Sequence, residues 1–487
     1  MKIRLLPVNP AVGALARNAD RLAEAARAAA ADGVEALLLP ARALEGAPLL
    51  GLADRPDYLR ARKAALASLS RRLPPGLPLF TTLSLDGDGG DKPVVLGRNL
   101  PPAARRVPAG LAYLPCRTAL ADDSPDGRRA ALSRAAKKAR RPLAAVNLLG
   151  GQDESVFDGA ACLFAADGSL LAASPRFSGD PLDFDLPARG APRPQPLPPP
   201  LSPEAACWAA ITLGIRDYVG KNGAPGVLVA LSGGMDSALV AALAVDALGP
   251  ARVLGATFPS RYSTSGTHRD AHRLADALGI PCLDIPIVPA VDALSAMLAA
   301  PGAATDAFPV LPGSLEAENL QARIRGVLGM ALANRHGLFM LETSNRSESL
   351  AGYCTLYGDT CGAYAPLASL YKTEVFALAR WRNAQGPRPV IPRSIIARPP
   401  SAELRPGQRD SDSLPPYDHL DPALRLVADR NLGAAEAAAA GAFPDAARRA
   451  LRLLFRSEYK RRQVAFGPQL AFPGPRLPAT NAFAGDP

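Results

Sequence analysis

The feature that most constrains the fold of this 487-residue chain is the segment 229–248, VALSGGMDSALVAALAVDAL. The apolar run at 226–231 predicts a buried strand, and the Ala-, Leu- and Val-rich sequence from Ser237 onward predicts a helix that ends at Gly249. A polar glycine turn, SGGMDS at 232–237, joins the two. Small residues let backbone N–H groups surround an anion, and a helix that starts at the same place adds the positive end of its dipole. The segment therefore predicts a phosphate-binding site.

The turn differs from the phosphate loop of the form GxxxxGK[ST], because it contains no lysine and has another spacing. It could also be only a tight turn before a helix. A plain turn would not need Asp236 and Ser237 beside the glycines, so the sequence favours a functional loop.

The order of the predicted elements indicates an α/β protein with two parts. Near the start of the chain we predict a strand, a helix and a strand at 3–7, 18–32 and 36–40, which is typical of an α/β sandwich or layered sheet. Around the glycine turn we predict helices at 205–218 and 268–278 and further strands at 252–258 and 282–287. This alternation predicts a doubly wound parallel sheet that binds ligands at the carboxyl ends of its strands. Loops are predicted at 299–314 and 398–416.

A proline-rich stretch, ARGAPRPQPLPPPLSP at 188–203, separates the two parts. Proline has no backbone N–H, so this stretch is expected to be extended. We therefore predict an N-terminal domain at 1–187, a linker at 188–203 and a C-terminal domain at 204–487.

The net charge of +10 raises the question of nucleic-acid binding. The one dense basic run, RAAKKARR at 134–141, is typical of a solvated helix face, and no nucleic-acid-binding motif accompanies it. No uninterrupted apolar span of about 20 residues is present, and the opening residues lack a secretory signal. The six cysteines show no CxxC spacing, which suits a reducing compartment. We expect a cytoplasmic protein that binds neither nucleic acid nor membrane.

The glycine turn resembles the SGGxDS loop of the ATP pyrophosphatases, which release pyrophosphate from ATP as they adenylate a substrate. Four further blocks occur in order at 318–334, 341–383, 398–421 and 457–463, among them ENLQARIRGVLGMALAN and SEYKRRQ. Together they resemble the synthetase domain of glutamine-dependent NAD synthetases, from about residue 203 to 483. The resemblance implies a ligase that adenylates deamido-NAD with ATP and then lets ammonia displace AMP to give NAD.

The resemblance also implies residue roles. Asp236, Glu348 and Lys372 are the implied catalytic residues, and Asp236 and Glu348 would also hold Mg²⁺, because carboxylates suit this hard cation. The implied ATP-binding residues are Ser232, Gly233, Gly234, Asp236, Ser237, Thr343, Lys372 and Ser401. The implied deamido-NAD-binding residues are Asn319, Arg323, Glu348 and Lys460. The loop at 398–416 would cover the bound adenylate and exclude water.

Each of these residues has a simpler interpretation. Arg323 and Arg325 could be surface charges on a helix, Lys460 could belong to a solvated cluster, and Glu348 could pair locally. The loop at 398–416 could be only disordered.

Three positions depart from the usual pattern of the family: Ser344 replaces a glycine, Arg346 a lysine and Ser369 an aspartate. Arg346 keeps the charge but has a planar guanidinium in place of a compact ammonium.

The N-terminal part resembles a nitrilase-like amidotransferase domain at 7–46 and 145–177. In that domain a Glu, a Lys and a nucleophilic Cys hydrolyse glutamine. Here Ala41 stands in place of the glutamate, and the interval between Thr81 and Leu143 is too short to contain the segments that carry the lysine and the cysteine. Cys116 has no neighbouring acid in the sequence, so we interpret it, like Cys162, as a structural residue.

We therefore predict a shortened, degenerate glutaminase domain joined to an NAD synthetase that uses ammonia, either free or from a separate glutaminase. We also expect a homo-oligomer. Two alternatives remain open at this point: a conventional glutamine-hydrolysing NAD synthetase, and a nucleotide-binding regulatory subunit without catalytic activity.

Overall fold

The computed structural model describes residues 1–84, 90–298, 313–470 and 475–480, and the chain divides into two compact units, Met1–Ser202 and Pro203–Pro487. Most of the loop predicted at 299–314 lies outside the described residues. No helix of the described part is both long enough and apolar enough to cross a membrane.

The N-terminal unit contains two sheets packed face to face. The first has the order β11-β1-β2-β3-β4, with β1 (Lys2–Leu5), β2 (Ala36–Ala41), β3 (Leu79–Ser84), β4 (Asp91–Leu96) and β11 (Leu182–Asp185). The second has the order β10-β9-β6-β5, with β5 (Ala112–Pro115), β6 (Leu143–Val146), β9 (Ala161–Phe164) and β10 (Leu170–Ala173). Alternate residues of β1 and β6, such as Ile3 and Ala144, meet in a buried core between the sheets. A hairpin of β7 (Leu149–Gln152) and β8 (Ser155–Asp158) completes the unit.

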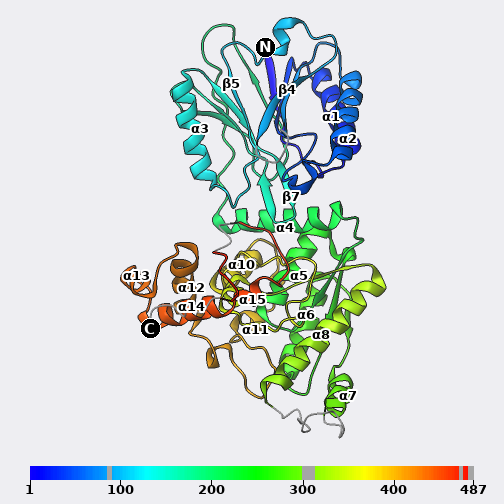
Figure 1. The fold of residues 1–487 in the computed structure, drawn as a ribbon, viewed down its shortest axis with the longest axis vertical. Helices are drawn as coiled ribbons and strands as arrows, with labels where there is room; N and C mark the ends of the chain where they lie inside the picture. The colour runs from blue at the N-terminus through cyan, green and yellow to red at the C-terminus, as the bar shows by residue number, and fades with distance from the viewer. Residues whose placement is uncertain (85–89, 299–312, 471–474, 481–487) are drawn as a thin grey trace. The chain divides into compact units, whose positions relative to one another are not determined.

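Helices cover the outer faces of both sheets. The helices α1 (Leu15–Ala31) and α2 (Pro56–Arg72) pack on the first sheet through Leu22 and Leu69, among others, and α3 (Pro125–Ala139) packs on the second through Leu132 (Figure 1). The result is an α–β–β–α sandwich. The basic run at 134–141 is indeed an exposed face of α3 and the turn that follows it.

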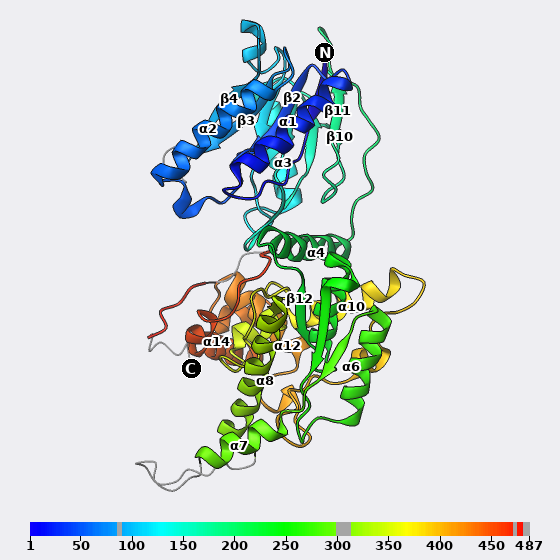
Figure 2. The same ribbon diagram turned by 90° about the vertical axis from the view of Figure 1, so that its right-hand side faces the viewer.

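The C-terminal unit is built on a parallel sheet with the order β14-β13-β12-β15. Its strands are β12 (Val227–Ala230), β13 (Val253–Thr257), β14 (Cys282–Asp284) and β15 (Phe339–Leu341). One face packs against α4 (Pro203–Lys221), α5 (Met235–Leu248), α6 (Ser265–Leu278) and α10 (Lys372–Ala384). The other packs against α7 (Val288–Leu298) and α8 (Leu315–His336), so α6 and α8 lie on opposite sides of β12 (Figure 2). The predicted α/β fold class, with a doubly wound parallel sheet, is confirmed.

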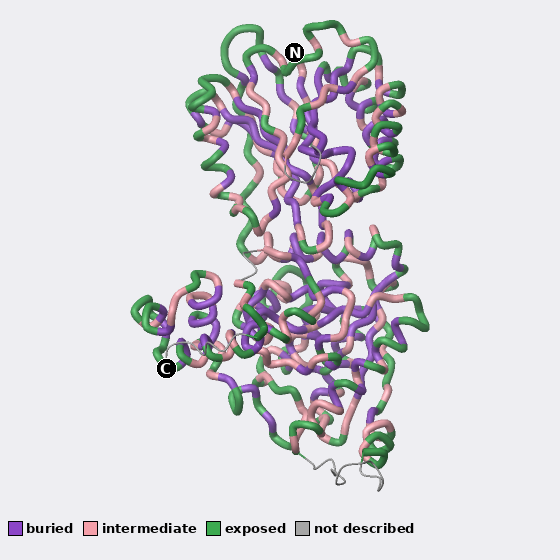
Figure 3. The backbone as a smooth tube through the Cα atoms, viewed as in Figure 1, coloured by how far each residue is buried: buried purple, intermediate pink, exposed green. Residues whose placement is uncertain are grey.

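Burial follows this layered order, because the strands inside each unit are buried while the outer helix faces are exposed (Figure 3). A further helical group has its own apolar core around Leu420, Leu424 and Ala447. It contains α9 (Arg346–Ala351), α12 (Tyr417–Leu424), α13 (Ala434–Ala439) and α14 (Pro444–Arg456). The short helices α11 (Arg393–Ala397) and α15 (Glu458–Arg461) complete the described part.

Most predicted elements differ from the observed ones by a few residues at their ends, and two of these differences have a clear local cause. The helix predicted at 268–278 begins at Ser265, because the Thr264 side chain accepts a hydrogen bond from the Thr267 N–H and caps it. The strand predicted at 282–287 ends at Asp284. Pro286 has no N–H to donate, although Ile285 and Ile287 still donate to carbonyl groups of the neighbouring chain segment.

Candidate functional site

The glycine turn lies at the carboxyl end of the central strand β12 and leads directly into α5. Its two serines brace it: Ser237 Oγ accepts from the Ser232 N–H at 3.2 Å, and Ser232 Oγ accepts from the Gly234 N–H at 3.2 Å. Gly233 has a φ of +76°, and a Cβ atom there would lie 2.1 Å from the Thr267 carbonyl oxygen. No side chain fits such a space, so the glycine at this position is required by the geometry.

A cavity of about 280 Å³ opens beside this turn. Its walls come from the carboxyl ends of β12, β13 and β15, from α8 and from the loop that begins at Arg398. Seven of the eight residues expected to bind ATP line it: Ser232, Gly234, Asp236, Ser237, Thr343, Lys372 and Ser401. The eighth, Gly233, is the residue between two of them, and its carbonyl accepts from Arg398 Nη1 at 2.9 Å.

The three residues expected to be catalytic meet on one wall of the cavity. Lys372, the first residue of α10, places its Nζ 2.6 Å from Asp236 Oδ2 and 3.0 Å from Glu348 Oε1. Asp236 Oδ1 also accepts from Asn345 Nδ2 at 2.9 Å. Asn345 caps α9 together with Glu348, so one short helix start positions both the amide and the carboxylate.

This cluster contains more carboxyl groups than cationic groups. A third carboxylate, that of the buried Asp410, accepts from the hydroxyl groups of Tyr353 and Tyr417 at 3.2 and 2.9 Å. Burial raises the pKa of Asp410, and burial together with the Asp236 carboxylate raises the pKa of Glu348 despite the Lys372 ammonium. One ammonium group thus faces three carboxyl groups, which suits an additional hard cation such as Mg²⁺.

Lys372 itself is held in the charged form. Although burial alone lowers the pKa of its ammonium, the Asp236 and Glu348 carboxylates raise that pKa above its ordinary value. The side chain is only 3% exposed, so the ion pairs act with little screening by water.

The loop at 398–416 forms part of the cavity wall, from Arg398 to Leu404. Its Glu403 accepts hydrogen bonds from Thr267 Oγ1 at 3.0 Å and Thr264 Oγ1 at 3.4 Å, which ties the loop to the start of α6. Ser401 Oγ donates to the Gln408 carbonyl at 2.6 Å. The described loop is therefore an ordered wall with tertiary contacts.

The remaining residues expected to bind deamido-NAD gather around the segment 352–356. Lys460 Nζ donates to the carbonyl oxygens of Gly352 and Cys354 at 2.7 and 2.6 Å. Asn319 Oδ1 accepts from Thr355 Oγ1 at 2.8 Å, and Arg323 Nε donates to the Leu356 carbonyl at 3.2 Å. Of the four, only Glu348 is among the residues that line the cavity in the described part of the chain.

Several residues in or beside the cavity were not singled out as site residues from the sequence. Arg325 lines the cavity, donates from Nε to the Phe258 carbonyl at 3.1 Å and has a pKa that burial lowers to about 10. Asn345 could have been found from the N-x-x-E spacing of a capping box. Asp410 and Arg398 lie in an irregular loop, where the sequence offers no periodic signal.

The three departures from the family pattern have different environments. Arg346 is buried, forms an ion pair with Asp429 and lies over the Tyr371 ring, 5.4 Å from its centre. Ser344 lines the cavity. Ser369 Oγ donates to the Pro468 carbonyl at 2.7 Å.

In the N-terminal unit, Ala41 ends β2 and its N–H donates to the Cys116 carbonyl at 3.2 Å. Next to it the buried Arg42 places Nε 2.6 Å from Asp91 Oδ1. Burial raises the pKa of the Cys116 thiol to about 12 and that of Cys162, a buried residue of β9, to about 11. Neither thiol therefore has the lowered pKa that is typical of an activated, nucleophilic cysteine.

Glu342, which precedes Thr343 at the end of β15, is expected to make the stability of the protein depend on pH. Burial raises the pKa of its carboxyl group from 4.5 to about 8, so the folded state binds a proton there that the unfolded state releases above pH 4.5. The stability contributed by this proton is present at low pH and falls by about 1.4 kcal/mol per pH unit as the pH rises toward 8. We expect Glu342→Gln to remove this loss, because a neutral amide can still accept from the Ala465 N–H. Urea denaturation of both proteins at pH 5 and pH 8 measures it, and an equal pH dependence in the two would contradict the prediction.

The parallel sheet, the glycine turn and the cavity beside it define a nucleotide-binding α/β domain of the ATP pyrophosphatase class, in a chain that also contains an α–β–β–α sandwich. More particularly, the chain belongs to the NAD synthase family, whose model matches residues 207–464. A relative from Xanthomonas campestris, named glutamine-dependent NAD(+) synthetase, is 37% identical over all of this chain and 98% of its own length. One of the same name from Rhodobacter capsulatus is 35% identical over 99% of this chain and 96% of its own.

Solved structures agree with this assignment. The glutamine-dependent NAD+ synthetase of Acinetobacter baumannii, in complex with ADP, is 28% identical, with a TM-score of 0.73 over 97% of this chain and 96% of its own. The enzyme of the same name from Cytophaga hutchinsonii, 18% identical, has the same fold with a TM-score of 0.80 over 99% and 98% of the two chains.

Proposed function

We propose that this chain is an ATP-dependent ligase that converts deamido-NAD to NAD. The carboxylate of deamido-NAD attacks the α-phosphorus of ATP and releases pyrophosphate, and ammonia then displaces AMP from the adenylated intermediate to form the amide. The observation that carries the proposal is the cavity in which the glycine turn, Asp236, Lys372 and Glu348 converge. Membership of the NAD synthase family supports it.

In this proposal the chain acts by positioning and by charge. The backbone of Ser232–Ser237 and the start of α5 bind the ATP phosphates, and Lys372 stabilises the negative charge that grows on them. Asp236 and Glu348 would hold Mg²⁺, which supplies charge neutralisation at the phosphates. The wall from Arg398 to Leu404 excludes water, which protects the adenylated intermediate from hydrolysis.

For the nitrogen source we propose ammonia. A glutaminase of this kind needs a base, a cation and an activated thiol together. Ala41 has no side chain that accepts a proton, and burial raises the pKa of the Cys116 thiol, the reverse of what activates a nucleophile. Glu45, four residues after Ala41, is fully buried in an ion pair with Arg62 at 3.0 Å, which leaves it in a structural role. The alignment with the Xanthomonas relative spans 549 positions against the 487 residues here, a difference of 62, so this chain is shorter than that relative.

The second candidate is a synthetase that hydrolyses glutamine. The names of the relatives favour this alternative over the use of ammonia, since the full-length relatives are called glutamine-dependent. The third interpretation, a regulatory subunit without activity, is disfavoured by the intact charge cluster around Lys372. The homo-oligomer, the separate glutaminase and the cytoplasmic location stay predictions.

One experiment separates the two nitrogen sources. The purified protein is given ATP, Mg²⁺ and deamido-NAD, with either ammonium or glutamine freed of ammonium, and NAD is measured. We expect NAD with ammonium and a rate lower by about 100-fold or more with glutamine, because the hydrolytic residues are missing. Cys116→Ala is expected to leave the ammonium-dependent rate unchanged. Efficient use of glutamine that disappears in Cys116→Ala would mean that this cysteine is the nucleophile, whereas no NAD from either source would contradict the synthetase itself.

A further inference from the structure

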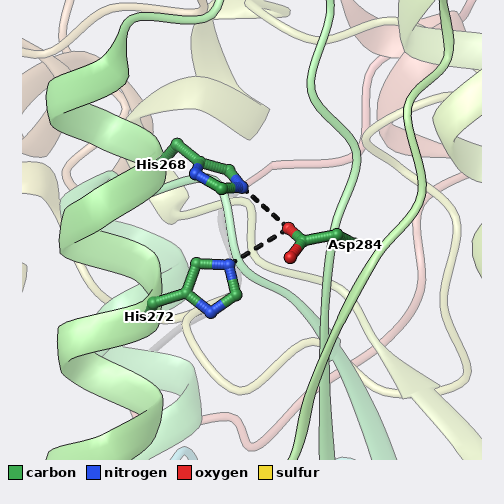
Figure 4. Close-up of side chains that lie close together, drawn as sticks. All are labelled: His268, His272 and Asp284. Carbon is green, nitrogen blue, oxygen red and sulfur yellow. Dashed lines mark hydrogen bonds and ion pairs between the residues drawn. The ribbon is translucent and has the colours of Figure 1, made fainter.

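Two histidines and an aspartate converge beside the nucleotide cavity, outside the cluster of Lys372. Nε2 of His268 lies 2.7 Å from Oδ1 of Asp284, and Nε2 of His272 lies 3.1 Å from the same oxygen. Figure 4 shows both imidazole rings turned toward the carboxylate. One potential ligand atom from each residue lies within 4.8 Å of the other two. The proposed function assigns no role to His272 or Asp284.

The local fold explains why these side chains meet. His268 and His272 are four residues apart on α6, so both project from one face of the helix. Asp284 is the last residue of β14, the strand that follows α6 in the chain. The Thr257 hydroxyl donates to Asp284 Oδ1 at 2.6 Å and fixes the orientation of the carboxylate from the neighbouring strand β13. Two ligands on one helix and one on an adjacent strand give a preorganised set.

The chemistry of this set suits a transition-metal ion. Two imidazole nitrogens and one carboxylate oxygen are ligands that Zn²⁺ takes at roughly 2.0–2.2 Å, commonly as three protein ligands with a fourth position for water. In a tetrahedral complex such ligand atoms lie roughly 3.3 Å apart. The two N···O distances here, 2.7 and 3.1 Å, are shorter than this, so a bound ion would move the ligand atoms apart by a few tenths of an ångström.

The surroundings leave access for an ion. The side chains of His268, His272 and Asp284 are 39%, 34% and 46% exposed, and His268 also lines the nucleotide cavity. The carboxylates of Asp236, Glu348 and Asp410 offer oxygen ligands only, a set that suits Mg²⁺. The imidazole nitrogens of His268 and His272 therefore give this group a different metal preference from that of the carboxylates around Lys372.

We propose that His268, His272 and Asp284 bind one divalent transition-metal ion of the Zn²⁺ type per chain, with a coordination position left for water at the wall of the nucleotide cavity. Thr257 is the positioning residue of this site, since it orients a ligand without contacting the ion. The proposal does not depend on the reaction that the cavity performs.

The test uses Co²⁺ as the metal, because its visible absorption reports the ligands and the geometry. The full-length protein is titrated with Co²⁺ in the presence of excess Mg²⁺, which occupies carboxylate-only sites. We expect one Co²⁺ per chain with a tetrahedral spectrum, displaced by one equivalent of Zn²⁺. The variants His272→Ala and Asp284→Asn are each expected to weaken binding by about 100-fold or more, and Thr257→Val by about 10-fold.

The four histidines of the chain supply the control, since His336 and His419 lie outside this group. The double variant His336→Ala/His419→Ala is expected to bind Co²⁺ like the wild type. Circular dichroism identifies any variant that does not fold, and Thr257→Val, which keeps all three ligands, then still tests the site. Three results would overturn the proposal: no saturable Co²⁺ binding in the wild type, unchanged binding in His272→Ala, or loss of binding in the control variant. The three side chains would then only be hydrogen-bonded to one another.

Discussion

Replacing Lys372 with methionine is expected to lower kcat/KM for ATP by about 1,000-fold or more. Methionine has a similar length and no charge, so the change removes the ammonium while it keeps most of the packing. A preorganised charge in a buried site typically contributes a factor of this size when it stabilises a transition state. Lys372 Nζ is within 3.0 Å of both Asp236 and Glu348, on the wall of the cavity where the phosphates are proposed to bind.

The same change is expected to lower the free energy of unfolding at pH 7 by roughly 3–5 kcal/mol, because it leaves buried carboxylates without their cation. Lys372→Arg is expected to fold, since it keeps the charge. It is nevertheless expected to be inactive, because a planar guanidinium does not fit between two carboxylates arranged for a compact ammonium. Lys138→Met, on an exposed face of α3, is the matched control and should change neither quantity. Initial rates of NAD formation give kcat/KM, and urea denaturation gives the free energy of unfolding. A Lys372→Met variant with activity within tenfold of the wild type would contradict the role of Lys372 in the proposed mechanism.

The sequence predicted the part of the fold that depends on local patterns. The apolar run and the glycine turn at 226–237 became β12 and the start of α5, because hydrophobic periodicity and capping are properties of neighbouring residues. The strand at 282–287 was shorter than predicted, because one proline interrupts its regular pairing. The helical group of α9 and α12–α14 was not predicted as a unit with its own core, since its core depends on which helices pack together.

The arrangement of the site could be predicted even less well from local sequence patterns. Asp236 and Lys372 are 136 residues apart in the chain, and Asp236 and Asn345 are 109 apart, so no spacing rule brings them together. The family resemblance named Asp236, Glu348 and Lys372, yet it did not indicate Asp410 or the three-to-one excess of carboxyl groups that surrounds the ammonium. Burial and charge together decide that property, and both require the folded chain.

The second large effect is expected from Gly233→Ala, which should lower kcat/KM for ATP by about 100-fold or more by raising KM for ATP. The added Cβ would lie 2.1 Å from the Thr267 carbonyl oxygen, so either the turn or the start of α6 must move. Movement of the turn also displaces the N–H groups that are proposed to bind the phosphates, and a shift of about 1 Å in a positioning group is enough to cost this factor.

Gly223→Ala separates this clash from backbone strain. Gly223 has nearly the same φ, +72° against +76°, but a Cβ atom there meets no other atom within 4 Å. Both variants share the strain of a left-handed alanine, about 1–3 kcal/mol, and only Gly233→Ala has the steric overlap. We therefore expect strain to lower the free energy of unfolding by a similar amount in both variants. Only Gly233→Ala should also lose ATP binding, measured as KM for ATP and by calorimetric titration of ATP. Equal KM values for ATP in the two variants would mean that the turn tolerates a side chain and that the phosphates bind elsewhere in the cavity.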